Sequence, residues 1–423
     1  MKTIVFVESN KSGSSREAIR AADKMGYFTV LLTNRKKFFE QISEFVDVHH
    51  IILTNTKKMD SLREEINKLK HRGLYIELIA SFVHPFVSKA AILSKEFCNT
   101  NISADTIADM EDKITMRQVL KESLYNPFYY IHEPTNSIPS TVDHCRNQYP
   151  LIIKAPLSTG SKDVYKVNNE QELTDSIVTL ENKYGNKPVL IEQFIDGPQY
   201  LIETLTIDKI LYIVSIFEQE ITKQKRFIVT GYRLIVEPSS DLYHKLLKAA
   251  QSIVDQAGME NGACHFEFRL KGNDYILIEL NPRISGGAMN RMIEAGYGIN
   301  LVEKTLNLML GNTVDLKPKF KKHVYIYYIT MSESGILEKI TGKKRAKKCP
   351  GIKEVFLKPK KGTMLYPPLS MGHRYAYVLA IGDTPEQAEQ FSKTAAKEIV
   401  FHLKSNSTDS ALESLNNEES DKW

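Results

Sequence analysis

The 423-residue chain has few of the features that would point to a secreted, membrane or zinc protein. It has four cysteines (Cys98, Cys145, Cys264 and Cys349), and no two of them form a C-x-x-C pair. This spacing argues against a disulfide framework or a zinc site and fits a reducing cytoplasm. No signal peptide is visible, and no apolar run approaches the length of about 18 residues that a membrane span needs. We therefore expect a cytoplasmic protein with no membrane partner.

The charge balance is also unremarkable. The net charge of +5 arises from 56 basic and 51 acidic residues, and hydrophobic residues make up 42% of the chain. These values are ordinary for a globular enzyme of two to four domains and do not argue for nucleic acid. The basic run 343–348 is interpreted as a solvated loop. A G-x-G-x-x-G motif is absent, which makes a dinucleotide site unlikely.

The most informative stretch is ACHFEFRLKGNDYILIELNPR, residues 263–283, which predicts two strands and a tight turn at Lys271–Asp274. Either a three-residue loop with a bulge or a five-residue loop places Glu267 opposite Glu279 and His265 opposite Asn281. Like charges at paired positions repel each other, so this pair calls for a cation. Since all the donor atoms are hard oxygens, they suit Mg²⁺. The alternative is a surface hairpin with solvated charges.

The residues that follow this hairpin suit an anion. Arg283 comes two residues after Asn281, and a guanidinium there could bind a phosphate or a carboxylate through two hydrogen bonds. Gly286 and Gly287 allow the backbone to approach a ligand closely. Together with the carboxylates, these residues favour a metal–phosphate site.

Upstream, the pattern predicts further elements. Residues 1–79 read as a β-loop-α-β start of a parallel sheet, and 104–123 as one long helix that contains Lys113. Residues 149–156 form an apolar strand whose single cation, Lys154, needs an anionic partner. The loop 158–162 between two strands offers backbone and hydroxyl donors to a phosphate. Strands then dominate from 323 onward, a helix spans 384–402, and the tail 405–423 is expected to be disordered.

Taken together, these pieces resemble the ATP-grasp superfamily of carboxylate–amine ligases, and within it the bacterial L-amino acid ligases that make dipeptides. The most specific motifs are DKITMRQVL, IIKAP, VLIEQFIDGPQYLIE, GACHFEFRL and YILIELNPRISGG. The resemblance covers residues 1–403. It implies an α/β chain, α+β in its C-terminal half, with an ATP-grasp fold behind a Rossmann-like domain. The implied domains are 1–100, 101–192 and 193–403, before a tail at 404–423.

The resemblance also implies roles for individual residues. The residues implied for ATP are Lys113, Lys154, Ser158, Thr159, Gly160, Ser161, Glu192, Gln193, Phe194, Ile195 and Glu203. Those implied for the metal are Glu267, Glu279 and Asn281, and those for the substrate are Arg283, Gly286 and Gly287, with Arg283 and His265 catalytic. Two roles stay open. His265 either braces the hairpin or meets substrate, and Glu203 either orients Lys154 or approaches substrate.

The function that follows from the resemblance is ligation of two L-amino acids through an acyl phosphate, with release of ADP and phosphate. ATP and Mg²⁺ are the expected cofactors, Mn²⁺ is possible, and a homodimer is possible because dimers are common in the family. Two alternatives remain. One is an ATP-grasp carboxylase that acts through carboxyphosphate, and the other is a nucleotide-binding protein without turnover.

Overall fold

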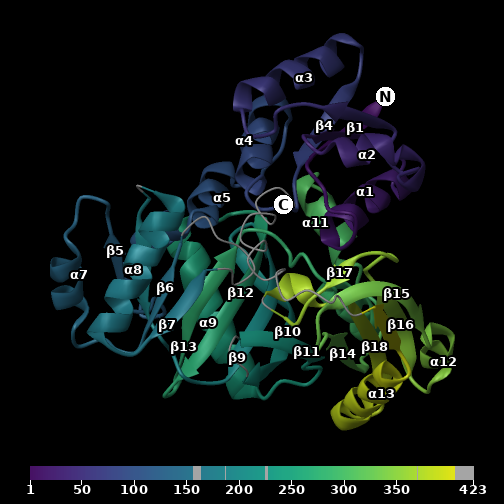
Figure 1. The fold of residues 1–423 in the computed structure, drawn as a ribbon. Helices are drawn as coiled ribbons and strands as arrows, with labels where there is room; N and C mark the ends of the chain where they lie inside the picture. The colour runs from purple at the N-terminus through teal and green to yellow at the C-terminus, as the bar shows by residue number, and fades with distance from the viewer. Residues whose placement is uncertain (156–162, 186, 224–226, 369, 405–423) are drawn as a thin grey trace. The chain divides into compact units, whose positions relative to one another are not determined.

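The computed structural model describes residues 1–155, 163–185, 187–223, 227–368 and 370–404 (Figure 1). The loop predicted to cover phosphates, at Ser158 to Ser161, and the predicted disordered tail therefore lie outside the described residues. The chain divides into two compact units. The first contains Met1–Glu218 with Leu234–Lys321, and the second contains Gln219–Arg233 with Lys322–Trp423.

The first unit begins with a four-stranded parallel sheet in the order β3-β2-β1-β4. Its strands are β1 (Lys2–Val7), β2 (Phe28–Thr33), β3 (His50–Leu53) and β4 (Tyr75–Ala80). The accompanying helices are α1 (Ser14–Lys24), α2 (Lys36–Glu40), η1 (Ile42–Glu44), α3 (Met59–His71) and α4 (Val87–Phe97). Five consecutive β1 residues are buried, because helices cover both faces of a parallel sheet. The predicted Rossmann-like start is confirmed.

The next stretch is not the single helix predicted over 104–123. It contains α5 (Ala104–Glu111) and α6 (Lys113–Val119), separated by Asp112. Asp112 has an extended backbone with φ −87° and ψ 118°, and its side chain accepts a hydrogen bond of 2.8 Å from the Thr115 amide. An aspartate in this role starts a new helix, so the local capping preference outweighs the apolar periodicity on either side.

A small antiparallel sheet follows, in the order β5-β8-β6-β7. Its strands are β5 (Tyr129–His132), β6 (Leu151–Lys154), β7 (Val164–Val167) and β8 (Val189–Gln193), and its helices are α7 (Ile138–Cys145) and α8 (Glu170–Tyr184). Leu151, Ile153 and Ile191 from the sheet share a buried core with Leu173 and Ile177 of α8. The alternation of buried and polar positions turns the Lys154 side chain away from this core.

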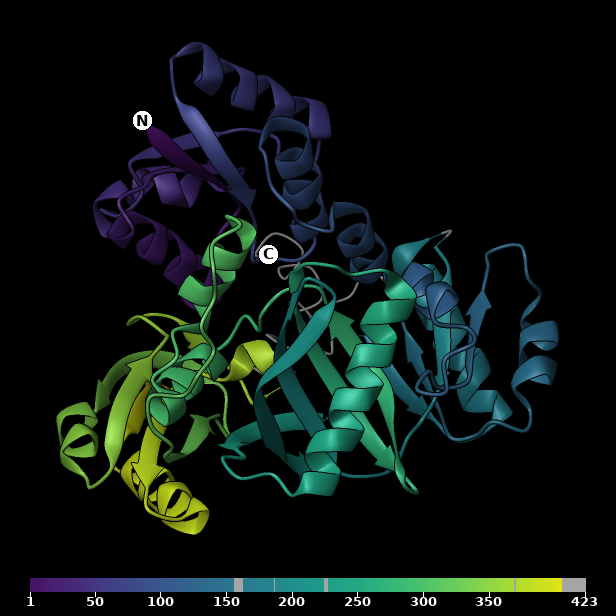
Figure 2. The ribbon, with the colours of Figure 1, turned by 180° about the vertical axis from the view of Figure 1, so that it is seen from behind.

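The last sheet region of the first unit has the order β13-β12-β9-β10 and is antiparallel (Figure 2). Its strands are β9 (Gln199–Ile207), β10 (Ile210–Lys223), β12 (Gly262–Lys271) and β13 (Asp274–Asn281). The helix α9 (Ser240–Ala257) lies along it, and α10 (Met289–Tyr297) and α11 (Leu301–Met309) follow the last strand. The fully buried Phe266 and Phe268 point to one face of this sheet, so His265 and Glu267 point to the other.

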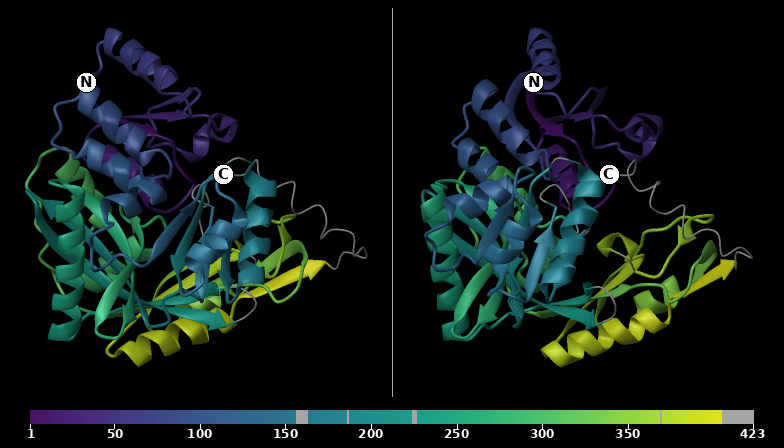
Figure 3. Two further views of the ribbon diagram at one scale, coloured as in Figure 1. Left: turned by 90° about the vertical axis from the view of Figure 1, so that its left-hand side faces the viewer. Right: turned by 60° about the vertical axis from the view of Figure 1, so that its left-hand side comes forward.

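The second unit contains a sheet in the order β11-β14-β18-β16 and a smaller one in the order β17-β15-β19. The strands are β11 (Phe227–Leu234), β14 (His323–Ile329), β15 (Gly335–Thr341), β16 (Ile352–Leu357), β17 (Met364–Leu365), β18 (Ala376–Gly382) and β19 (Val400–Lys404). The helices are α12 (Lys343–Lys348), η2 (Met371–His373) and α13 (Pro385–Lys397), and α13 packs on β18 and β14 (Figure 3).

Two predictions for this second unit were wrong. The helix expected over 384–402 ends at Lys397, because residues 400–404 form β19 and pair with β15. The basic run 343–348 is a short helix instead of a loop, and it begins after Gly342, whose φ of 87° suits glycine. Among the described residues, no helix is long and apolar enough to cross a membrane.

The Asp112 cap leads to a stability prediction. Replacement of Asp112 by Ala removes the acceptor for the Thr115 amide, so we expect the free energy of unfolding to fall by about 1 kcal/mol. Urea denaturation measures the loss. Asp112→Asn is the matched control, because asparagine caps helices as well as aspartate and should keep the stability of the wild type. An equal loss in both variants would show that capping is not the cause.

Candidate active site

The hairpin of β12 and β13 brings two carboxylates face to face. The strand register pairs His265 with Asn281 and Glu267 with Glu279, and a bulge follows Glu267. The predicted register is therefore confirmed, but both predicted loop lengths are wrong. Lys271 pairs with Asp274, which leaves a two-residue turn, and the bulge then brings Glu279 opposite Glu267. Paired positions on neighbouring strands have Cβ atoms about 4.5–5.5 Å apart, at which distance two carboxylates repel each other unless cations compensate them.

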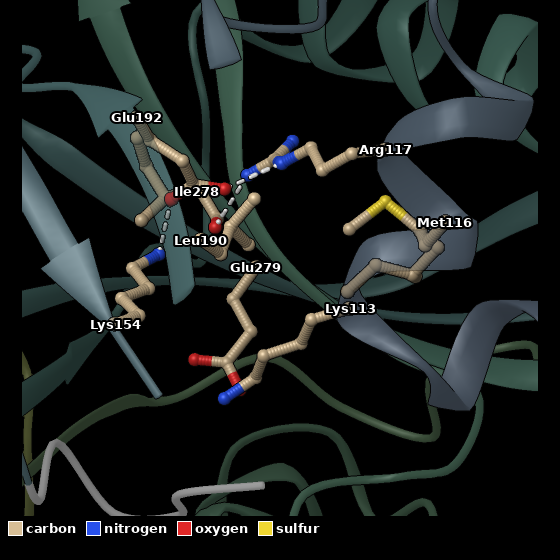
Figure 4. A pocket seen from close by; sticks show the side chains of 9 residues that line it. Lys113, Met116, Arg117, Lys154, Leu190, Glu192, Ile278 and Glu279 are labelled. Carbon is tan, nitrogen blue, oxygen red and sulfur yellow. Dashed lines mark hydrogen bonds and ion pairs between the residues drawn. The ribbon is translucent and has the colours of Figure 1, made fainter. Parts of the chain in front are cut away.

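Cations do surround Glu279. Burial alone would raise the pKa of the Glu279 carboxyl, but Lys113, Lys154 and His265 together hold it below its usual range. The close view shows the Glu279 carboxylate pointing toward the Lys113 amine, while Lys154 comes from β6 of the small antiparallel sheet (Figure 4). Glu267 in turn accepts a hydrogen bond of 2.6 Å from the amide of Gln199. Glu279 is thus an ionised carboxylate at neutral pH.

These side chains fit a hard divalent cation. The Asn281 amide nitrogen lies 3.4 Å from Glu279 Oε1, which leaves the amide oxygen of Asn281 as a further donor beside the two carboxylates. Within the described residues, no group of three or more His, Cys, Asp or Glu side chains is gathered as a complete metal cage. Two carboxylates and an amide are a partial set. Such a set suits Mg²⁺, which commonly completes its shell with water and substrate phosphates.

A buried ion-pair triad holds Lys154 in place. The Lys154 amine lies 2.5 Å from Glu192, and Arg117 Nε lies 2.6 Å from the other Glu192 oxygen. Arg117 also donates to the Ile278 carbonyl at 2.9 Å, which ties α6 to β13. Burial would raise the pKa of Glu192, but the two cations lower it to about 2. Sequence reasoning missed Arg117, although it stands one helical turn after Lys113.

The pocket around this triad combines charge with apolar walls. Its lining residues are Lys113, Met116, Arg117, Lys154, Leu190, Glu192, Ile278, Glu279 and Leu280 (Figure 4). Glu192 is 3% exposed and its carboxylate is engaged with Lys154 and Arg117, so its side chain is not available to a ligand. Lysine amines and aliphatic side chains line the same pocket, and a nucleotide requires both kinds of group.

The segment after β8 carries the other residues expected near adenine. The Phe194 ring lies under the Lys166 amine at 3.9 Å and under Arg269 at 5.5 Å. Ile195 is buried and accepts a hydrogen bond from Arg269, and Gln193 accepts one of 2.8 Å from Lys271. The side chains of this segment therefore have partners within the protein.

Glu203 and His265 form a second buried network. Glu203 is fully buried. One of its carboxylate oxygens lies 2.7 Å from His265 Nδ1, and the other accepts a hydrogen bond of 3.1 Å from the Ser285 backbone amide. His265 Nε2 lies 3.6 Å from Glu267. Burial lowers the pKa of His265, but Glu203 more than offsets this and raises it to about 10. This geometry favours the role in which His265 braces the hairpin. Glu203 contacts the hairpin through His265, whereas Lys154 pairs with Glu192 and not with Glu203. Both roles stay predictions.

Arg283 is held next to this network with one donor unused. Its Nη1 donates to the Ile284 carbonyl at 2.9 Å, whereas its buried Nε has no hydrogen-bond partner among the described residues. Burial lowers the pKa of Arg283. A buried guanidinium nitrogen without an acceptor is costly, so the position suits an anionic ligand.

The loop with Gly286 also meets the loop after β1. Gly13 has a φ of +80°, and a Cβ there would lie 2.1 Å from the Gly286 carbonyl oxygen, so only glycine fits. Ser14 Oγ donates to the Ser285 carbonyl, and Arg291 binds Glu17 at 2.7 Å. The Ser285 hydroxyl and the Asn290 amide oxygen are buried without partners among the described residues. Sequence reasoning missed Gly13, Ser14 and Asn290, because no local pattern marks a contact between distant loops.

Comparisons with known proteins agree with this geometry. Residues 147–291 match the model of the ATP-grasp domain, and residues 327–404 match the L-amino acid ligase C-terminal domain 2. An L-arginine-specific L-amino acid ligase of Bacillus subtilis is 22% identical over 86% of this chain and 89% of its own length.

Solved structures show the same fold. The L-amino acid ligase from Bacillus licheniformis has a TM-score of 0.79 at 20% identity and covers 96% of this chain and 99% of its own. The biotin carboxylase domain of Hydrogenobacter thermophilus 2-oxoglutarate carboxylase, in complex with MgADP and bicarbonate, has a TM-score of 0.70 at 16% identity. It covers 95% of this chain and 91% of its own.

The chain thus has an ATP-grasp fold, and its residues 147–291 match an ATP-grasp domain. The C-terminal part of the chain, residues 327–404, resembles the second C-terminal domain of L-amino acid ligases.

The Glu192 triad leads to a prediction about stability and pH. Glu192→Gln leaves Lys154 and Arg117 buried without their carboxylate, so we expect a loss of about 3–5 kcal/mol in unfolding free energy at pH 7. The pKa of Glu192 is about 2, below its ordinary 4.5. Its contribution is therefore present above pH 4.5 and is lost as the pH falls toward 2.

Denaturant unfolding at several pH values measures this difference. The stability gap between the wild type and Glu192→Gln should shrink as the pH falls below 4.5. A matched control is Glu398→Gln, whose partner Arg345 is a surface residue. It should change the free energy of unfolding by no more than about 1 kcal/mol. A gap that stays constant down to acid pH would refute the buried ion pairs.

Proposed function

We propose that this protein is an ATP-dependent ligase that joins the carboxyl group of one L-amino acid to the amine of another. The observation that carries the proposal is the buried Nε of Arg283, which has no hydrogen-bond partner in the described part of the chain and lies on the loop that follows the strand of Glu279. An unused guanidinium donor beside a partial metal site suits a reaction that makes an anionic phosphorylated carboxyl group. The L-amino acid ligase C-terminal domain supports amino acids as the substrates.

In this proposal the nucleotide lies along the pocket of Figure 4. Lys113 and Lys154 contact its phosphates, and residues 192–195 meet adenine through backbone groups. Glu203, on β9, is also assigned to the ATP site in this proposal. Ser158, Thr159, Gly160 and Ser161, which lie outside the described residues, are also proposed to bind the phosphates. Glu267, Glu279 and Asn281 would hold Mg²⁺ or Mn²⁺, which neutralises charge on the transferring phosphate.

The reaction then proceeds in two steps. A carboxylate oxygen of the first amino acid attacks the γ-phosphorus of ATP, the bond to the β-phosphate oxygen breaks, and ADP leaves. The amine of the second amino acid attacks the acyl carbon, phosphate leaves with the bonding electrons, and the amine loses a proton. Arg283 stabilises the acyl phosphate and the oxyanion that precedes its collapse. His265 holds the hairpin in register, and Gly286 and Gly287 allow substrate to approach the backbone.

We further propose that residues 1–100 form the substrate-framing domain, 101–192 the smaller ATP-grasp subdomain and 193–403 the larger one, before a tail at 404–423. A homodimer is compatible with this organisation.

The function is tested by phosphate release from MgATP with single and paired L-amino acids. We expect release only when amino acids are present, ADP as the nucleotide product, a dipeptide by mass spectrometry and no release after chelation of the metal. Bicarbonate in a separate well is the control for a carboxylase. Release with bicarbonate alone would contradict the ligase, and ATP binding without release in any well would favour a protein without turnover.

The role of Arg283 is tested by substitution. Arg283→Ala removes a donor that is preorganised for the acyl phosphate, so we expect kcat to fall by a factor of about 10²–10³ with a small change in the KM for ATP. Arg63→Ala is the control, because Arg63 forms surface ion pairs on α3 and should keep normal turnover. Normal turnover in Arg283→Ala, with the protein folded by circular dichroism, would refute the assignment.

A further inference from the structure

The loop between β13 and α10 gathers buried polar atoms that have no partner in the described part of the chain. Besides Arg283 Nε, these atoms are Ser285 Oγ and Asn290 Oδ1. Ser285 is 6% exposed and Asn290 is 3% exposed, so bulk water does not serve them. A buried polar atom without a hydrogen bond costs free energy. Such a concentration within eight residues indicates a ligand that carries several polar groups.

The orientation of the Asn290 amide is fixed by its neighbours. Its Nδ2 donates to the Ser285 carbonyl at 3.1 Å, and Ser14 Oγ donates to the same carbonyl. The opposite orientation would bring the amide oxygen against a carbonyl oxygen, and neither of these atoms can donate. Asn290 Oδ1 is therefore an acceptor, and the group that it lacks is a donor.

Ser285 has a fixed backbone and an unused side chain. Its amide donates to Glu203 at 3.1 Å, while its carbonyl receives Ser14 and Asn290. Every backbone hydrogen-bonding group of Ser285 is thus engaged, and these bonds set where its hydroxyl lies. A hydroxyl can accept as well as donate, so Ser285 Oγ offers a second acceptor without rearrangement of the loop.

The loop is open to a ligand directly after Ser285. Gly286 and Gly287 are exposed. Among the described residues, only Arg283 Nη1 would lie within 4 Å of a Cβ added to Gly286, at 3.9 Å. The space beside the guanidinium is therefore accessible along the glycine backbone. A ligand that enters here meets a cationic donor in Arg283 and two neutral acceptors on the same loop.

The charges around Arg283 favour a ligand that is not purely anionic. Burial lowers the pKa of Arg283, and three carboxylates oppose that fall. They belong to Glu203, Glu279 and Glu111. These carboxylates repel a second anion and attract a cation. A zwitterion, which brings a positive charge together with its carboxylate, is therefore favoured over a plain carboxylate.

We propose that Ser285 and Asn290 bind the α-ammonium group of the amino acid whose carboxyl group is activated beside Arg283. This inference rests on the proposed function and assigns its selection of α-amino acids over other carboxylic acids. One carbon atom separates the two charged groups of an amino acid, so a single short loop can bind both. An ammonium group donates three hydrogen bonds, and Ser285 Oγ and Asn290 Oδ1 accept two of them.

The test follows the first step alone. Hydroxylamine attacks the acyl carbon of an acyl phosphate, phosphate leaves, and a hydroxamate forms, so no second amino acid is needed. Each amino acid is compared with the acid that lacks its amine: L-alanine with propanoate, L-leucine with isocaproate, and L-phenylalanine with hydrocinnamate. The wild type should prefer the amino acid of each pair.

Two variants remove the acceptors. Ser285→Ala keeps every backbone bond of the loop, and Asn290→Leu replaces the amide by an apolar group of similar size. In both we expect the KM for the amino acid to rise by about tenfold or more, because a hydrogen bond to a charged group is lost. The KM values for the deamino acid and for ATP should stay at wild-type levels. Ser252→Ala is the control, because the Ser252 hydroxyl bonds Gln256 within α9 and should leave both kinds of substrate unaffected.

Each outcome decides the question. Equal shifts for both members of a pair, or no shift in Ser285→Ala, would overturn the subsite. So would a shift in the KM for ATP, which would assign these atoms to the nucleotide. Equal use of both members by the wild type would overturn the subsite and keep the ligase. If no pair gives a hydroxamate, the proposed reaction fails with these acids, and calorimetric titration in the presence of MgADP decides. Tighter binding of the amino acid, lost in Ser285→Ala, would then support the subsite, whereas equal binding or none would overturn it.

Discussion

The repulsion between Glu267 and Glu279 is the constraint on which the first unit depends. Strand pairing fixes the two carboxylates opposite each other, and burial raises the free energy of the charged form of Glu279. Lys113 and Lys154 compensate Glu279, and these cations come from two other segments of the chain. Lys154 is in turn held by Glu192, which is also bound to Arg117. The site is therefore a set of opposite charges in which each group limits the position of the next.

The Glu203 network extends this arrangement to the loop that holds Arg283. One Glu203 oxygen binds His265 and the other receives the Ser285 amide, so β9, β12 and the loop after β13 are joined through one buried carboxylate. Ser14 then bonds the Ser285 carbonyl from the start of α1. Arg283 is thereby held by the rigid backbone around it. Its unused Nε needs no reorganisation to meet an anion, which is the condition for strong electrostatic stabilisation.

The sequence was most informative where the determinants are local. The turn residues and the alternation in residues 263–283 predicted the hairpin register, which is confirmed. The break at Asp112 was missed because apolar periodicity continues on both sides of a residue that prefers to cap. β19 was read as the end of a helix, since only its partner β15 makes it a strand. The Arg117–Glu192 and Glu203–Ser285 contacts join distant segments, and no local pattern records them.

The charge balance of the site determines which ligands it favours. Beside the carboxylates Glu192, Glu203, Glu267 and Glu279 stand the cations Lys113, Arg117, Lys154, His265 and Arg283, with the high pKa of His265 keeping its imidazole charged. A divalent cation alone would add positive charge beside these cations, and a nucleotide alone would add negative charge beside the carboxylates. Bound together, the metal offsets part of the negative charge of the triphosphate, and the excess of cations in the site offsets part of the rest. The same electrostatics that stabilise the folded site therefore favour the metal–nucleotide complex over either component alone.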